Sequence, residues 1–385
     1  MPVNPASTLR DPRLLGWCLS PALPLLVLLN LLRFAEDGRV LWLWAMPAFT
    51  YIGLPLLDAL LGEDRRNPTE ADAAALARQW RYRVLVALYL PLQLAATVMG
   101  CWVVAHGSLS AWAWAGLLLS VGGVNGVGIN AAHELGHKRA RWERALAWLT
   151  LAPTAYGHFF IEHNRGHHLR VATLDDPASA RLGESFWAFL PRTMAGSLRS
   201  AWSLEAARLR ASGRTALHWR NQNLQAWSLS VLLFGALATY FGFQVLPFLL
   251  AQALYGASLL EVVNYIEHYG LKRARRADGR LEPCQPCHSW NSSHRISNLF
   301  LYHLQRHSDH HAHPGRRYQV LRHDASAPQL PSGYPAMLLA AYVPPLWFWL
   351  MNPRVLAHYG GDIERAQLHP PRAAALRASH SAAPT

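Results

Sequence analysis

Long apolar runs constrain the fold of this chain more than any other feature of its sequence. The runs that approach or exceed the length of a membrane span lie at about 14–32, 39–61, 84–105, 110–132, 225–246 and 247–263. A helix needs about 20 apolar residues to cross a bilayer, where every backbone polar group must be paired internally. The composition agrees, since 51% of the residues are hydrophobic and only 15% are charged. We therefore predict an all-α, polytopic membrane protein with six transmembrane helices.

The polar segments between these runs predict a cap on the membrane domain. Residues 133–224 and 264–334 are polar and rich in histidine, and we expect them to form a helical cap on the cytoplasmic side. Residues 1–352 would then form a single membrane-embedded domain.

Two later segments are expected to stay out of the membrane core. The apolar run at 335–351 is short and interrupted by proline, which favours packing on the protein or at the interface over a span. The tail at 353–385 is rich in Ala, Pro and Arg, which predicts disorder after about residue 365.

Basic residues predict the orientation of the spans. The formal net charge is +13, yet of 36 Lys and Arg only Arg33 and Arg39 fall in loops on one side of the predicted bundle. Because basic residues concentrate on the cytoplasmic side, both termini and the cap are predicted to be cytoplasmic. No basic motif interleaved with aromatic residues accompanies the charge, so we expect no nucleic acid partner.

The chain has 20 histidines, and many of them cluster at helical spacing. The clustered residues are His133, His137, His163, His167, His168, His307, His310 and His311, and a single His268 after the sixth predicted span joins them. Residues three or four apart on a helix share a face, so each cluster is expected to direct its imidazoles at one point. The clusters begin at or near the cytoplasmic ends of predicted spans and can converge there. Nine imidazoles exceed the four ligands of one zinc ion and suit two ions, without choosing among iron, zinc and copper.

The stretch 133-HELGH-137 also matches the H-E-x-x-H pattern of zinc proteases. In that alternative Glu134 is the general base, and Asp175-Asp176 offers a further ligand. The alternative leaves seven clustered histidines without a role. We instead expect nearby carboxylates to orient the imidazoles; these carboxylates are Glu134, Glu162, Glu267 and Asp309.

Other motifs carry weaker signals. Cys284-x-x-Cys287 lacks the second cysteine pair of a zinc knuckle, so a structural role is favoured. Gly122 and Gly126 favour close helix packing over a channel lining. Four tryptophans could line or cap a substrate channel, but an interfacial belt is the favoured interpretation; they are Trp42, Trp44, Trp112 and Trp114.

Several motifs taken together resemble one enzyme family. The stretches HELGHK, EHNRGHH, NYIEHYG and LQRHSDHHAHP, supported by GEDRRNP and HSWNS, resemble the integral-membrane non-haem di-iron alkane 1-monooxygenases. The resemblance runs from about residue 14 to 352. Membrane fatty-acid desaturases also have three histidine boxes. However, the stretches NYIEHYG and QRHSDHH resemble those of the hydroxylases.

The resemblance implies a chemistry and a set of partners. The nine clustered histidines would hold two iron ions, and O2 would hydroxylate the terminal methyl of an n-alkane in a bacterial inner membrane. Electrons would come from rubredoxin, which is reduced by rubredoxin reductase. Ten Lys and Arg between 264 and 334 suit docking of an acidic carrier, and we expect Arg316 and Arg317 to contribute. The rivals are a desaturase, which gives an alkenyl product, and a non-catalytic metal carrier.

Overall fold

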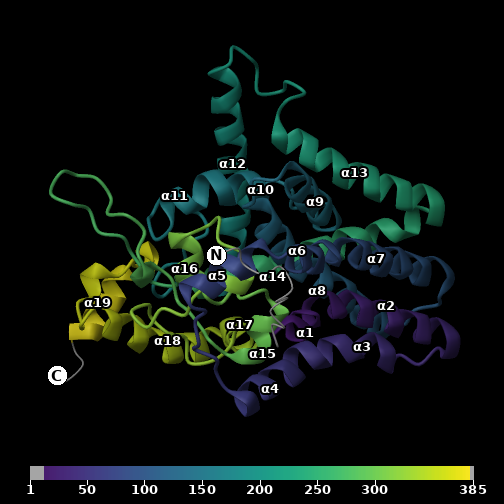
Figure 1. Cartoon of the computed structure of the whole chain (residues 1–385), viewed down its shortest axis with the longest axis horizontal. Helices are drawn as coiled ribbons and strands as arrows, with labels where there is room; N and C mark the ends of the chain where they lie inside the picture. The colour runs from purple at the N-terminus through teal and green to yellow at the C-terminus, as the bar shows by residue number, and fades with distance from the viewer. Residues whose placement is uncertain (1–12, 382–385) are drawn as a thin grey trace, which may run out of the picture.

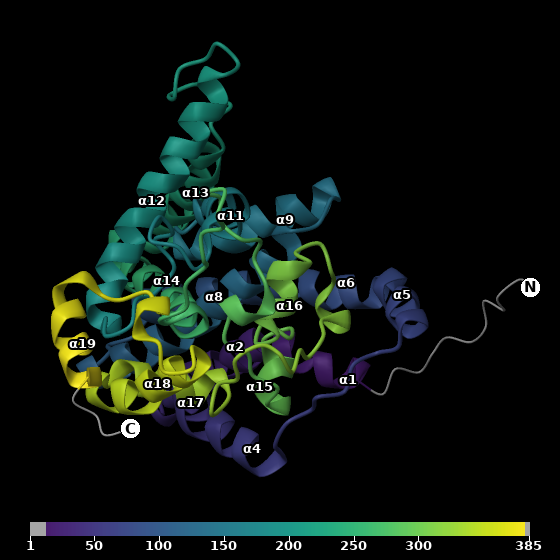
Figure 2. The same cartoon turned by 90° about the vertical axis from the view of Figure 1, so that its left-hand side faces the viewer.

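The computed structural model describes residues 13–381, and within that range it is helical, with isolated β-bridges and no β-strand. The predicted all-α class is therefore confirmed. In Figures 1 and 2 long helices form a bundle, shorter helices gather at one end of it, and α12 (Phe186–Arg210) projects to one side.

Six helical segments are long and apolar enough to cross a membrane, as predicted. They are α2 (Leu19–Asp37), α3 with α4 (Leu41–Ala48 and Leu54–Leu61), α6 with α7 (Trp80–Ala87 and Tyr89–His106), α8 (Ala111–Gly136), α13 (Gln222–Phe241) and α14 (Leu246–His268). The first span lies a few residues beyond its predicted position of 14–32. A separate short helix, α1 (Leu14–Trp17), precedes it, and Gly38 ends it in the left-handed conformation, with a φ of 69°.

Close contact between α8 and α14 forms the centre of the bundle. A Cβ atom at Gly122 would lie 2.9 Å from the carbonyl oxygen of Gln252, and one at Gly126 would lie 2.9 Å from that of Gly256. Since any larger residue would push the helices apart, both glycines serve helix packing, as their spacing predicts. This contact places the last turns of α8 and α14 side by side.

Short helices form the cap at the end of the bundle where α8 and α14 finish. They include α5 (Glu70–Arg78), α9 (Arg141–Leu151), α10 (Phe159–Glu162), α11 (His168–Arg170), α15 (Arg295–Phe300) and α16 (His307–Ala312). A π-helical turn, His163–His167, joins α10 to α11. The cap therefore carries every clustered histidine that α8 and α14 do not.

The C-terminal region differs in part from expectation. The run at 335–351 forms α17 (Tyr334–Tyr342) and α18 (Pro344–His358), and neither is among the candidate spans. Disorder after about residue 365 is wrong as far as Ser381, because α19 (Ala373–Ser381) follows there. Residues 382–385 lie outside the described range.

Long-range contacts order this tail, and composition does not reveal them. The backbone N–H of Leu182 donates to Gln367 at 2.7 Å, and that of His369 donates back to Leu182 at 3.0 Å. Arg377 of α19 also pairs with Glu364 at 2.5 Å.

Candidate metal centre

The structure brings all nine clustered histidines together in two adjacent groups. In each group one ring nitrogen of every member lies within 4.8 Å of the others. The five-histidine group consists of His133, His137, His163, His168 and His310, and the four-histidine group consists of His167, His268, His307 and His311. The clusters therefore converge at one end of the bundle, as the sequence predicts.

Imidazole nitrogens face one another in the five-histidine group. The Nε2 atoms of His133 and His310 are 2.9 Å apart, those of His137 and His163 are 3.1 Å apart, and those of His163 and His168 are 3.0 Å apart. These residues come from α8, the π-helical turn, α11 and α16, so the group joins the bundle to the cap.

The four-histidine group is more deeply enclosed, since all its members are buried. The Nε2 atom of His307 lies 3.2 Å from that of His268 and 2.9 Å from that of His311. The Nε2 atom of His167 is buried and has no hydrogen-bond partner in the described structure. A buried ring nitrogen with an unused lone pair, aimed at three others, fits a metal ion.

The π-helical turn divides its histidines between the groups. The i,i+4 spacing predicts that His163 and His167 share a target, but His163 belongs to one group and His167 to the other. The ring of His167 stacks on that of His163, with centroids 5.2 Å apart, but its Nε2 atom belongs to the other group. A π-helix pairs residue i with residue i+5, and it is His168 whose Nε2 atom meets that of His163. The neighbours His310 and His311 on α16 are divided in the same way.

Burial keeps these imidazoles in the form that binds metals. Removal from water lowers the pKa of the cap histidines His163, His168, His307, His310 and His311 well below the ordinary value, and the neighbouring imidazoles lower it further. At neutral pH the rings are therefore uncharged and present a lone pair.

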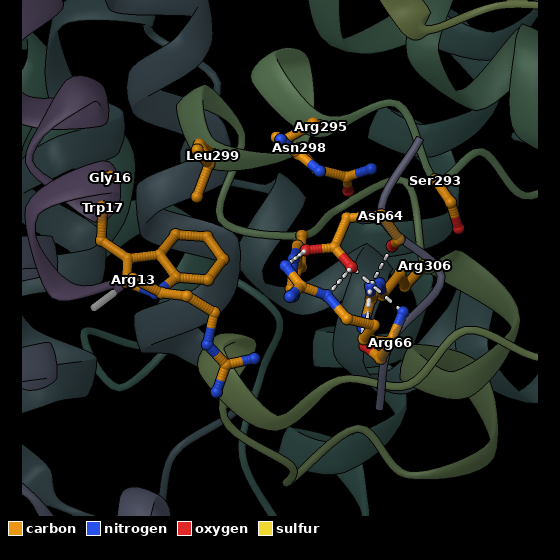
Figure 3. A pocket seen from close by; sticks show the side chains of 11 residues that line it. Arg13, Gly16, Trp17, Asp64, Arg66, Ser293, Arg295, Asn298, Leu299 and Arg306 are labelled. Carbon is orange, nitrogen blue, oxygen red and sulfur yellow. Dashed lines mark hydrogen bonds and ion pairs between the residues drawn. The ribbon is translucent and has the colours of Figure 1, made fainter. Parts of the chain in front are cut away.

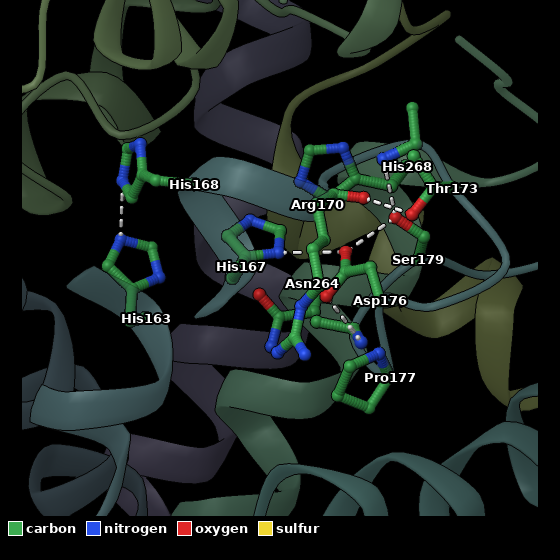
Figure 4. Close-up of polar contacts among 12 residues, drawn as sticks. His163, His167, His168, Arg170, Thr173, Asp176, Pro177, Ser179, Asn264 and His268 are labelled. Carbon is green, nitrogen blue, oxygen red and sulfur yellow. Dashed lines mark hydrogen bonds and ion pairs between the residues drawn. The ribbon is translucent and has the colours of Figure 1, made fainter. Parts of the chain in front are cut away.

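Sequence reasoning named Asp176 only as a ligand in the zinc-protease alternative and missed its contact with His167. Its Oδ2 atom lies 2.9 Å from Nδ1 of His167 and also accepts a hydrogen bond from Ser179 at 2.6 Å (Figure 4). Burial raises the pKa of this carboxyl, but His167 and Ser179 more than offset that effect and hold the pKa below its usual value. An ionised Asp176 fixes His167 with Nδ1 protonated and Nε2 directed into the four-histidine group.

The predicted orienting carboxylates behave differently from one another. Oε2 of Glu267 lies 3.2 Å from Nε2 of His307, so this carboxylate does reach an imidazole. Glu134 instead pairs with Lys138 at 2.9 Å, which leaves it poorly placed as the base of a zinc protease. Glu162 pairs with Arg170 at 2.8 Å, and Asp309 pairs with Arg316.

An apolar cavity of about 110 Å³, on the membrane side of the histidines, is lined by α8 and α14 together with α4, α15 and α17. Its walls include Gly123, Gly126, Leu259 and Leu304. Asn130, which also lines it, precedes His133 by one helical turn, so the cavity leads toward the five-histidine group.

The tryptophans predicted as channel residues lie outside the lining of this cavity. Trp44 and Trp112 stack with ring centroids 3.9 Å apart and line a separate hollow on the bundle. Trp42 donates a hydrogen bond to Asp37, and Trp114 packs against a core cluster of the bundle. Tyr51 lines both the hollow and the apolar cavity and connects the two.

Comparisons with known proteins agree with this architecture. The family model described as fatty acid desaturase matches residues 108–340. The alkane 1-monooxygenase of Acinetobacter baylyi is 44% identical over 381 residues, which cover 98% of this chain and 93% of the relative. That of Pseudomonas putida is 44% identical over 352 residues, covering 91% and 88%. The hydroxylase component of the xylene/toluene monooxygenase of Pseudomonas putida is 28% identical over 334 residues, covering 86% of each chain. Because the 44% identity extends over nearly the whole chain and includes every segment that carries a clustered histidine, this chain belongs to the alkane 1-monooxygenase family.

Proposed function

We propose that this protein hydroxylates the terminal methyl group of n-alkanes with O2 and gives primary alcohols. The observation that carries the proposal is the pair of histidine groups at the end of an apolar cavity. An alkane has no polar group to recognise, so only the shape of an apolar cavity can orient it. The relatives named above as alkane 1-monooxygenases support the choice of substrate.

The nine histidines would hold two iron ions, one in each group. Iron is proposed because zinc has no redox chemistry. The two irons would supply the activation of O2. Neutral imidazoles suit this role, and Asp176 keeps His167 in one tautomer. The apolar walls of the cavity, which include Leu304, would exclude water and position the methyl group.

The membrane orientation belongs to this proposal. We place the histidine end of the bundle on the cytoplasmic side of a bacterial inner membrane, since basic residues concentrate there. A soluble cytoplasmic electron carrier could then reach the cap.

The decisive experiment is turnover in 18O2 with purified protein, an n-alkane, rubredoxin and its reductase. We expect one labelled oxygen atom in the alcohol for each O2 consumed. An alkenyl product without label would identify a desaturase instead. Binding of iron without O2 uptake would indicate a metal carrier.

Substitution of Gly123 by leucine is expected to shorten the range of accepted alkanes. Gly123 lines the cavity, and a Cβ atom there would have no neighbour within 4 Å, so leucine takes cavity space without a clash. Loss of room for a few methylenes should lower kcat/KM for the longest alkanes by roughly 10- to 200-fold relative to short ones. Gas chromatography of products from a mixture of alkanes measures this ratio.

Gly235→Leu on α13 is the matched control. A Cβ atom at Gly235 also has open space around it, but this glycine does not line the cavity. Equal chain-length profiles for both variants would show that the apolar cavity does not hold the substrate.

We place docking of rubredoxin beside the segment that carries His168. Leu169 and Leu174 are exposed by 71% and 61%, which gives an apolar centre close to the five-histidine group. The hairpin at 272–282 bears exposed Arg276 and Arg280. Its Arg273 donates a hydrogen bond to the carbonyl oxygen of Leu169 at 2.9 Å, which holds the hairpin beside this centre.

The structure disfavours Arg316 and Arg317 as docking residues. Arg317 pairs with Glu143 at 3.0 Å and is only 20% exposed, while Arg316 pairs with Asp309. Their reversal would therefore disturb the cap itself.

Reversal of Arg276 and Arg280 to glutamate should lower kcat/KM for rubredoxin by about 10-fold at low salt, and the difference should shrink as salt rises. Stopped-flow reduction of the metal centre measures the effect. Arg210→Glu, at the end of α12, is the control, because this exposed arginine lies on a different part of the chain. A salt-independent loss, or an equal loss in the control, would place docking elsewhere.

A further inference from the structure

A further cavity, of about 370 Å³, lies beside α1 and α15 (Figure 3). None of its described lining residues belongs to either histidine group. Its volume falls within the range of small-molecule sites. Its walls combine charged residues with the apolar surface of Trp17 and Leu299.

The charges around this cavity favour an anion. The lining arginines are Arg13, Arg66, Arg295 and Arg306, and Asp64 is the one carboxylate among the described lining residues, which leaves an excess of three positive charges. Asp64 is occupied by Arg66, whose Nε and terminal nitrogens donate to it at 2.8 and 2.7 Å. The cavity therefore keeps a net positive charge although its carboxylate is paired.

Two buried polar atoms of lining residues have no partner. Arg306 is only 2% exposed and donates through its terminal nitrogens to the carbonyl oxygens of Leu321 and Asp64, each at 2.7 Å. Its Nε–H is left without an acceptor. Asn298 is 3% exposed, and its Oδ1 is left without a donor. Since buried polar groups are nearly always paired, the two atoms point to a bound group that both accepts and donates hydrogen bonds.

The cavity lies beside the start of the first candidate span, where the head groups of a bilayer would be. Gly16 and Trp17 belong to α1, which leads directly into the first candidate span, Leu19–Asp37. Leu15 on the same short helix is 81% exposed, so the helix has an apolar side that acyl chains can cover. Basic pockets at this depth attract anionic phospholipids.

We propose that this cavity binds the phosphodiester head group of an anionic phospholipid with a hydroxylated head group, of which phosphatidylglycerol is the simplest. A phosphate oxygen accepts from Nε of Arg306, and Arg295 at the rim adds charge. A head-group hydroxyl donates to Oδ1 of Asn298. The acyl chains pass along α1 into the bilayer. This site does not depend on the proposed enzymatic function.

Binding is tested with the full-length protein in detergent after removal of lipid. Short-chain phosphatidylglycerol is titrated and followed by native mass spectrometry and by the thermal unfolding midpoint. We expect one bound molecule per chain and a concentration-dependent rise of the midpoint. Arg295→Glu should weaken binding by at least about 10-fold, because it reverses a charge at the rim.

Arg81→Glu is the matched control. Arg81 is exposed near the start of α6, at the same end of the bundle, and does not line the cavity. Its reversal should leave the affinity unchanged, which separates a site from general attraction to the basic face.

Three results would overturn the proposal. One is equal binding of phosphatidylcholine, and another is equal loss of affinity in both variants. The third is equally tight binding of glycerol phosphate, which would identify a soluble phosphate compound as the ligand. A rise of the midpoint with phosphatidylglycerol that Arg295→Glu abolishes and Arg81→Glu retains would support the lipid site.

Discussion

Replacement of His310 by alanine is expected to remove the ion of the five-histidine group and to abolish alkane hydroxylation. His310 faces His133 at 2.9 Å between Nε2 atoms, and α16 supplies no other residue to this group. The loss of activity should exceed the roughly 10- to 100-fold typical of residues that merely support a ligand. Elemental mass spectrometry should show a fall from about two irons per chain to about one.

His167→Ala makes the same test in the four-histidine group. His313→Ala is the control for both, because His313 is exposed next to α16 and belongs to neither group. Two irons retained in the His310 and His167 variants would contradict the assignment of ions to these groups. One zinc and negligible iron in the unaltered protein would favour a zinc protease instead.

Asp176→Ala is expected to lower turnover by roughly 10- to 100-fold while the chain stays folded. The change leaves Nδ1 of His167 without its partner at 2.9 Å, so the ring is free to turn its Nε2 atom away from the four-histidine group. Iron affinity, measured by competition with a chelator, should fall as well, whereas KM for the alkane should not change.

The neighbouring Asp175 supplies a control of the same residue type. It is exposed and adjacent in sequence, so Asp175→Ala should leave iron affinity and turnover unchanged. Asp176→Asn should recover part of the lost affinity, since an amide can still pair with the ring. If Asp176→Ala kept full iron affinity, the role of Asp176 would be limited to packing of the loop.

Sequence patterns sufficed for the features that depend on local periodicity. The six spans follow from apolar length. The histidines of both groups follow from clusters at helical spacing near the ends of spans, together with the single His268 after the sixth span. Which histidine belongs to which group could not be predicted, because the sequence EHNRGHH carries no signal for a π-helical turn. The difference between i+4 and i+5 pairing decides which group receives His167.

Features that arise from irregular segments could not be foreseen. Asp176 reaches His167 through a loop whose course no periodicity describes, and Ser179 and Ala178 hold its carboxylate from the same loop. Likewise, Arg317 pairs with Glu143, which lies 174 residues earlier in the chain, so composition could not reveal that this arginine is engaged within the cap, beside Arg316 and its partner Asp309.

The division of consecutive histidines between the groups has a consequence for metal loading. His167 and His168, and again His310 and His311, are joined by single peptide units, with Cα atoms about 3.8 Å apart. Two separate segments therefore tie the two histidine groups together, and neither group can be ordered without fixing part of the other. Binding of the first ion would order much of the chain that the second ion needs, so the second would bind with a smaller loss of conformational entropy. Iron should then enter cooperatively, and chains with one ion should be scarce at partial loading of the unaltered protein.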